Sequence, residues 1–248
     1  MINTLFDKIF VLTINRNLKR RLIVDKNLKS IQFEYWFGFD LPSEFSNIKY
    51  VSDLSNEFFE NNTLDKYSVK RMTKGQLGAY LSIKKIIEFI ASNDFKQVMI
   101  FEDDFNPLKK NWENILCNAI QELPNDWDIL LVGYIYSGFS YKLAYYRTFR
   151  PLLKIWSWIK KIITNKPQII LPNMFSNNLD TSGLCSGGHA FCLSHKGAIL
   201  LSKHLNPMKM SGYELVCKLI SEKKIKAYSV YPCLFSQNKL FESETRKS

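Results

Sequence analysis

The sequence predicts an α/β protein with an open, mostly parallel sheet flanked by helices. Short apolar runs rich in β-branched residues alternate with longer segments of helical periodicity. The runs at 97–101 and 129–133 are almost continuously apolar, as expected of central strands that are covered on both faces. The first of these two runs stops at three acidic residues, which is typical of a strand whose carboxyl end carries function.

The predicted elements follow one another at short intervals. In chain order they are strands at 9–14 and 33–37 with a helix from about Lys19 between them, a helix at 75–91, strands at 97–101, 129–133 and 190–194, and a helix at 195–204. The first strand ends at the polar residue Asn15, and the second runs into a turn that contains Gly38 and Pro42. This alternation is that of βαβ units in one open sheet.

Length and composition predict one folded domain. The chain has 248 residues and 46% hydrophobic content, which is enough for a single large core. We expect the domain to span 1–240, with a basic amphipathic insertion at 142–168 and a short tail at 241–248. The five cysteines are scattered and form no C-x-x-C pair, so neither a disulfide framework nor a zinc site is indicated.

Localisation and charge limit the classes of partner. The sequence shows no secretory signal and no stretch of roughly 20 apolar residues, which predicts a cytoplasmic protein. The formal net charge is +11, and residues 129–179 contain seven Lys or Arg and no Asp or Glu. Such a block attracts polyanions, including anionic lipid and phosphorylated glycolipid. The sequence has no zinc finger, no RNP-like aromatic strand and no basic repeat, so nucleic acid is not an expected partner.

Three acidic residues, Glu102, Asp103 and Asp104, follow directly after the predicted strand at 97–101. Because side chains alternate along an extended chain, Glu102 and Asp104 are expected on one side and Asp103 on the other. Mg²⁺ and Mn²⁺ take oxygen ligands, commonly one or two carboxylates together with substrate phosphate oxygens. The run therefore predicts that Glu102 and Asp104 bind a divalent cation, which would neutralise a departing diphosphate. A solvated acidic turn or a helix start would explain the same residues.

Four stretches of the chain match the motifs of a known family in order and at plausible spacing. They are VLTIN at 11–15 with the Lys-Arg-Arg triplet at 19–21, MTKGQLGAYLS at 72–82, IFEDD at 100–104, and CSGGHAFCLS at 185–194. With these motifs the sequence resembles glycosyltransferase family 25, which includes lipopolysaccharide and lipooligosaccharide β-galactosyltransferases and resembles the transferase domains of procollagen galactosyltransferases. The resemblance extends from about Ile9 to Gln237.

The resemblance implies a GT-A-like fold, a UDP-sugar donor (often UDP-galactose) and inversion at the anomeric carbon. It further implies that the acceptor is an oligosaccharide or a lipid-linked glycan. The chain departs from the family pattern at two positions: Gln76 stands in place of a Glu, and Ile83 in place of a His. Near the carboxyl end the family has an Asp, and the nearest match here is Glu214.

Roles follow for several polar residues. An inverting transfer requires a base near the acceptor hydroxyl, and we assign Glu214 to it, with Asp180 as the second candidate. One of Arg20 and Arg21 is expected to meet the donor's phosphates, since a guanidinium group matches phosphate geometry. The other residues assigned to the donor are Asn15, Asp103, Gly188 and His189. Gly188 and its neighbour allow close approach of the backbone, and a structural role for His189 stays open.

The basic segment contains an apolar helical stripe. Leu152, Ile155, Trp156, Ile159, Ile162 and Ile163 share one side of a helix, and Lys154, Ser157, Lys160 and Lys161 occupy the other. One interpretation is a helix that lies on an anionic membrane surface, which would place the protein peripherally on the inner face of the cytoplasmic membrane. A helix packed against the domain explains the stripe equally well.

Two function classes remain for the whole chain. The first is a transferase that uses a nucleotide sugar and a divalent cation, Mn²⁺ or Mg²⁺. The second is a relative that has lost catalysis and binds glycan or lipid, which Gln76 and Ile83 favour. The intact acidic run favours the enzyme.

Overall fold

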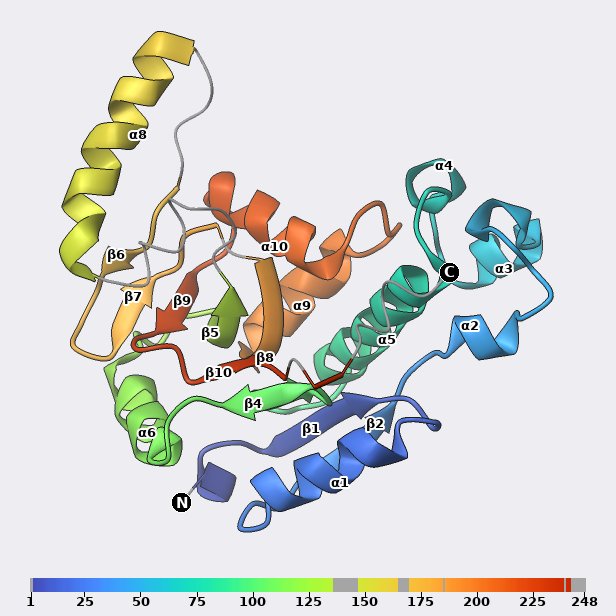
Figure 1. Ribbon diagram of the computed structural model, residues 1–248, viewed down its shortest axis with the longest axis horizontal. Helices are drawn as coiled ribbons and strands as arrows, with labels where there is room; N and C mark the ends of the chain where they lie inside the picture. Colours follow the sequence, from blue (N-terminus) through green and yellow to red (C-terminus); the bar gives the residue numbers. More distant parts are fainter. Residues whose placement is uncertain (1, 136–146, 165–169, 185, 239, 242–248) are drawn as a thin grey trace.

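The computed structural model describes residues 2–135, 147–164, 170–184, 186–238 and 240–241. Its strands form one ten-stranded sheet with helices on both faces (Figure 1). The strands are β1 Lys8–Thr13, β2 Glu34–Phe37, β3 Gln97–Glu102, β4 Phe105–Pro107, β5 Ile129–Ile135, β6 Asn173–Met174, β7 Leu179–Thr181, β8 Ser186–Ser194, β9 Ala227–Val230 and β10 Phe235–Gln237. The main path of the sheet is β2-β1-β3-β8-β5-β9-β7-β6, and β10 joins β4 to β5.

The sheet is mostly parallel in strand direction, as the sequence predicts. Strand β1 pairs in parallel with β2 and β3, and β5 pairs in parallel with β9. Strand β8 lies between β3 and β5 and is antiparallel to both, so β3 and β5 again point the same way. Along the main path, β8 and β7 are the reversed strands.

The predicted strand at 190–194 is longer than expected and reversed in direction. It forms the carboxyl half of β8, in which Ser194 is opposite Gln97 and Ala190 is opposite Phe101. Because β8 is antiparallel to β3, its amino end lies beside the carboxyl end of β3. If β8 were parallel to β3, its amino end would lie beside the amino end of β3. The antiparallel direction therefore brings His189 and its neighbours to the acidic run.

The predicted helices are present with small shifts at their ends. The helices are α1 Leu18–Asn27, α2 Leu41–Glu44, α3 Asn56–Asn61, α4 Lys66–Val69, α5 Lys74–Ala91, α6 Trp112–Glu122, α8 Arg150–Thr164, α9 His195–His204 and α10 Gly212–Ser221, with 3₁₀ turns at Ile2–Thr4, Val51–Asp53 and Arg147–Phe149. Helix α5 begins with a capping box formed by Thr73 and Gln76, and α10 begins with one formed by Ser211 and Glu214. Reciprocal hydrogen bonds of this kind satisfy backbone donors at the helix start and fix where the helix begins.

Two apolar cores lie on the two faces of the sheet. Side chains of the central strands alternate between them: Ile100 belongs to the core with α5, α9 and α10, and Phe101 to the core with α1 and α6. Both residues are fully buried. A strand that is apolar on both faces and ends in acids is thereby held rigidly, which fixes the position of the acids.

Helix α8 extends away from the sheet at the end where β6 and β7 lie (Figure 1). It falls within the predicted insertion at 142–168, of which 142–146 and 165–168 lie outside the described residues, as does most of the predicted tail. Within the described ranges, no helix combines the length and the apolar character needed to cross a bilayer.

Candidate active site

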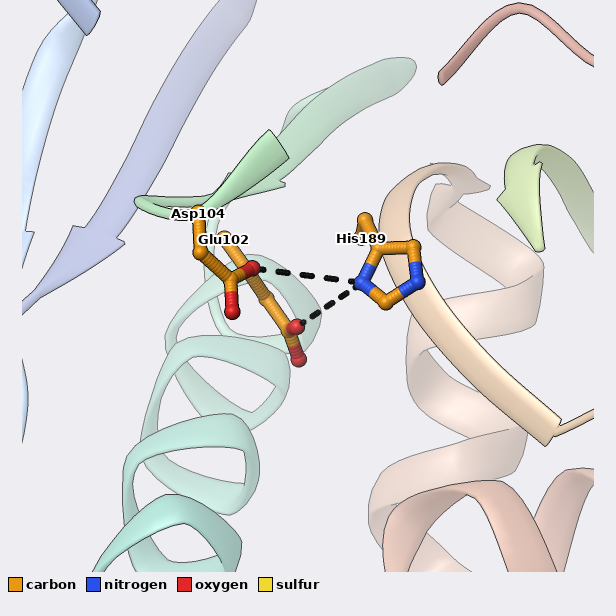
Figure 2. Close-up of side chains that lie close together, drawn as sticks. All are labelled: Glu102, Asp104 and His189. Carbon is orange, nitrogen blue, oxygen red and sulfur yellow. Dashed lines mark ion pairs between the residues drawn. The ribbon is translucent and has the colours of Figure 1, made fainter. Parts of the chain in front are cut away.

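The acidic run lies at the carboxyl end of β3, beside the amino end of β8. Glu102 is the last residue of β3, and Asp103 and Asp104 form the turn that leads to β4. His189 Nδ1 of β8 lies 3.6 Å from Glu102 Oε2 and 3.9 Å from Asp104 Oδ1. Figure 2 shows the ring nitrogen turned toward both carboxylates. Ligand atoms of the three residues all lie within 4.8 Å of one another, a spacing that can surround one metal ion.

Burial makes this cluster electrostatically unfavourable as it stands. Burial raises the pKa of Asp104 above its ordinary value, and the charge of Glu102 raises it further. Burial by itself would lower the pKa of His189, but Glu102 and Asp104 outweigh burial, so the pKa of His189 is raised. The protein holds two carboxylates close together, and a positive charge between them would stabilise both.

The unsatisfied atoms of the cluster fit a divalent cation. Asp104 Oδ1 and both ring nitrogens of His189 are buried, and no residue in the described part of the chain forms a hydrogen bond with them. Buried polar atoms without partners cost free energy, so such atoms commonly bind water or an ion. Carboxylate oxygens with an imidazole nitrogen suit Mn²⁺ or Mg²⁺. Ligation by His189 requires its neutral form, so protonation of His189 would compete with cation binding.

Asp103 also lines the site, and its carboxylate is fully engaged. Thr13 Oγ1 donates to Oδ2 at 2.6 Å, Asn17 Nδ2 donates to Oδ2 at 3.0 Å, and Arg20 Nη1 donates to Oδ1 at 2.8 Å. The guanidinium of Arg20 is buried and also lies 3.8 Å from Asp104 Oδ2. Asp103 therefore joins the acidic turn to β1 and α1 and holds Arg20 beside the cluster.

Tyr213 of α10 contacts Glu102 through its hydroxyl group. Its hydroxyl lies 2.8 Å from Glu102 Oε1 and 2.7 Å from the carbonyl oxygen of Gly188. A Cβ at position 188 would lie 2.1 Å from Tyr213 Cε1, so a side chain there would displace the tyrosine ring. Glycine at 188 is thus required by the approach of Tyr213.

The cluster opens into a cavity of about 560 Å³. Its polar part contains Glu102, Asp103, Asp104, His189, Arg20, Asn17 and Gln237, and the Arg16–Asp40 ion pair stands at its side. Gln237 of β10 donates to Asp104 Oδ2 at 2.9 Å. The deeper part is apolar and lies against α5, α9 and α10. A concave site of this size at the carboxyl ends of β1 and β3 is where open α/β sheets bind ligands.

The comparison with family models decides the family. The model described as "Glycosyltransferase family 25 (LPS biosynthesis protein)" matches residues 6–215. The chain belongs to glycosyltransferase family 25. The open α/β sheet with an acidic run at the end of a central strand agrees with the GT-A-like fold that the resemblance implied.

Curated relatives within family 25 include galactosyltransferases and inactive members. Procollagen galactosyltransferase 1-A of Xenopus laevis is 25% identical over 130 residues, 52% of this chain and 21% of its own length. Procollagen galactosyltransferase 2 of Homo sapiens is 23% identical over 131 residues, which cover 52% of this chain and 21% of that protein. Inactive glycosyltransferase 25 family member 3 of Mus musculus is 26% identical over 131 residues, which cover 52% of this chain and 22% of that protein. The match spans about a fifth of the length of these relatives.

Of the arginine pair in the family 25 opening motif, Arg20 lines the cavity and Arg21 does not. Arg21 donates to the carbonyl oxygens of Ile14 and Asn15 at 2.8 and 3.0 Å, and its guanidinium lies over the ring of Phe37. The side chain of Asn15 is exposed and is not part of the cavity lining. Arg21 and Asn15 therefore shape the loop after β1, and Arg20 presents its charge to the site.

The two carboxylates assigned to the base lie outside the cavity lining. Glu214 is exposed at the start of α10, where Oε2 accepts the Ser211 backbone N–H at 2.9 Å, and its neighbours Tyr213 and Leu215 line the cavity. Asp180 of β7 is completely buried between Arg147 and Arg150, at 3.0 and 2.7 Å. The structure thus places Glu214 next to the cavity and Asp180 in an ion-pair cluster away from it.

The two family 25 departures both face the cavity. Gln76 lines the cavity while its side chain caps α5, and Ile83 adds to the apolar part of the wall. Several polar residues of the cavity were not identified from the sequence, among them Thr13, Asn17, Tyr213 and Gln237. Asn17 directly precedes the helix with the arginines, and Tyr213 adjoins Glu214, so position gave a weak signal for both. Gln237 reaches the site by long-range strand pairing, which leaves no local signal.

Proposed function

We propose that this family 25 chain transfers a hexose, with galactose favoured, from a UDP-sugar to a hydroxyl of a surface glycan such as lipopolysaccharide or lipooligosaccharide, with inversion. The buried Glu102, Asp104 and His189 cluster carries the proposal, because its unpaired ligand atoms fit a cation that a diphosphate donor needs. The galactosyltransferases among the curated relatives support the choice of sugar.

Glu102, Asp104 and His189 would hold the cation, Mn²⁺ or Mg²⁺. When bound, it supplies positive charge that stabilises the departing UDP diphosphate. Arg20 lies on the other side of Asp104 and adds a fixed positive charge beside the same anion. The hydrogen bond from Arg20 to Asp103 holds the guanidinium group at the site. The donor-binding set is therefore Arg20, Asp103, His189 and the backbone near Gly188, with Arg21 and Asn15 shaping the adjoining loop.

Glu214 is the candidate base for the acceptor hydroxyl. It is solvent-exposed next to two residues that line the cavity, and a carboxylate so placed can accept the proton of an acceptor hydroxyl. Asp180 is buried and enclosed by two arginines outside the cavity lining, so it lies away from the proposed acceptor position. The geometry therefore favours Glu214 over Asp180.

The acceptor is proposed to be an oligosaccharide or a lipid-linked glycan at the inner face of the cytoplasmic membrane. The net charge of +11 favours anionic surfaces. Nucleic acid is not proposed as a partner.

A second candidate function is glycan or lipid binding without catalysis. Two observations favour it: Gln76 and Ile83 replace the family Glu and His on the cavity wall, and some curated relatives are named inactive. This candidate retains the ligand site and loses turnover.

Release of UDP from a panel of UDP-sugars, with Mn²⁺ or with EDTA, tests the proposal. We expect metal-dependent release from one donor, loss of release in Asp104→Asn, and retention in Asp94→Asn, an exposed Asp near the opposite end of β3. The Asp104→Asn variant should fold, because the raised pKa of Asp104 means that the fold already disfavours its charge. Absence of turnover with every donor, despite UDP binding, would favour the non-catalytic function.

A further inference from the structure

Helix α8 presents its apolar stripe to solvent. Five of its aliphatic and aromatic side chains are more than half exposed: Leu152 64%, Ile155 57%, Trp158 57%, Ile162 63% and Ile163 76%. Ile159 is 42% exposed on the same side. A domain helix normally buries its apolar face, as α5 does with Leu77, Leu81 and Ile86, which are fully buried.

The side of α8 that faces the protein lies opposite the apolar stripe. Leu153 and Ser157 lie one turn apart and are 7% and 2% exposed, and Arg150 belongs to the same buried line. At 3.6 residues per turn this line is on the side opposite the apolar stripe. Helix α8 therefore exposes the apolar face that a core helix would bury, and packing against the domain does not explain its stripe.

A buried ionic cluster fixes this orientation. Asp180 Oδ1 and Oδ2 pair with Arg147 and Arg150 at 3.0 and 2.7 Å, and Asp180 is completely buried. Both guanidinium groups lie over the ring of Tyr231, with distances of 4.1 and 5.5 Å to its centroid. Arg147 also donates to the carbonyl oxygens of Asn177 and Leu179. The amino end of α8 is thus attached to the sheet edge, and the rest of the helix extends outward (Figure 1).

The chemistry of α8 matches an anionic bilayer surface. Its 15 residues span about 22 Å, less than the ~30 Å hydrocarbon core, so the helix would lie in the interface. Trp158 stands at the border of the stripe, where an indole ring occupies the headgroup level. Lys154 and Lys161 are exposed on the polar side, and residues 129–179 contain no acid that would oppose anionic lipid.

We infer that α8 docks the protein in the plane of an anionic phospholipid membrane, with its apolar stripe in the acyl-chain boundary and the domain on the aqueous side. The inference builds on the proposed function for its purpose, since a lipid-linked acceptor is presented at that surface. The membrane contact itself requires no turnover.

Flotation with phosphatidylcholine vesicles, with and without phosphatidylglycerol, tests the inference. Wild type should float with the anionic vesicles at low salt and less at high salt. Ile162→Glu should reduce the bound fraction by roughly tenfold or more, since it removes apolar surface and adds a charge. Leu22→Glu is the matched control, because Leu22 is 70% exposed on α1 and undergoes the same chemical change. It should float like wild type.

Three results would overturn the inference. Wild type could remain in the soluble fraction with anionic vesicles at low salt, or both substitutions could reduce flotation equally. Light scattering could instead show a dimer that Ile162→Glu dissociates, which would mean that a second copy covers the stripe. Flotation does not depend on catalysis. Failure of the membrane-docking inference would therefore not affect the proposed transferase activity, and failure of the UDP-release test would not affect the docking inference.

Discussion

At the scale of single residues, the motif residues of the candidate site depend on contacts with residues outside the motifs. Tyr213 fixes Glu102, and it can do so because position 188 has no side chain. That Gly188 lets a ligand approach the backbone stays a prediction, and the structure shows the ring of Tyr213 packed against it. The motif shows that position 188 is glycine, and the contact with Tyr213 explains why a glycine is needed there.

The Gly188–Tyr213 contact gives a non-additive prediction. Gly188→Ala should push the Tyr213 ring off Glu102 and lower the affinity for Mn²⁺ by about tenfold, the effect of losing a hydrogen bond to a charged group. Tyr213→Ala should have a similar effect, and adding Gly188→Ala to it should cost little more. Calorimetric Mn²⁺ titration of the two single variants and the double variant measures this, and additive losses would argue against the contact.

Glu214 has an observed role as a cap of α10 and a proposed role as base, and the two are separable. Gln also accepts a backbone N–H in a capping box, so Glu214→Gln should change the free energy of unfolding by less than about 0.5 kcal/mol. The same variant lacks a basic carboxylate, so kcat should fall by about 10² or more while the donor KM stays the same. Denaturant unfolding and steady-state kinetics distinguish the roles; a variant with unchanged kcat would make Glu214 a cap and nothing more.

At the scale of elements, the sequence predicts strands and helices well and strand direction poorly. The segments at 9–14, 75–91 and 97–101 are found with shifts of one or two residues, because apolar periodicity and capping are local properties. The direction of β8 depends on which strands it pairs with, and this is a long-range choice. Gln237 joins the site for a similar reason, since β10 pairs with β4 and β5. The acidic run was predictable from local pattern, and His189 of β8 was predicted at the donor rather than beside Glu102 and Asp104. The partners from α10 and β10 were not predicted.

The attachment of α8 yields a stability prediction. Asp180→Ala would leave Arg147 and Arg150 facing each other in a buried place, and breaking a buried ion pair in this way costs about 3–5 kcal/mol. Urea unfolding should show that loss. Asp126→Ala, which removes a partner of Lys226 at the exposed surface, should leave the midpoint nearly unchanged. Equal, small effects of the two substitutions would mean that Asp180 is not an anchor.

At the scale of the whole molecule, the fold brings together residues from distant parts of the chain. The loop after β1, the turn after β3, the start of β8, the start of α10 and the end of β10 all meet at one cavity. Helix α8 extends away from another part of the same sheet (Figure 1). Its apolar stripe is exposed to solvent. The arrangement suits an enzyme that holds a nucleotide sugar in a pocket while a separate element contacts the surface that carries the acceptor.

The central claim is that a cation and the diphosphate of UDP share the site formed by Glu102, Asp104 and His189. Calorimetric titration of UDP into the protein, in Mn²⁺ and then in EDTA, tests it most directly. Because linkage is reciprocal, UDP should bind at least about tenfold more tightly with Mn²⁺, and Asp104→Asn should abolish the difference while Asp94→Asn preserves it. Equal UDP affinity with and without Mn²⁺ in the wild type would contradict the claim.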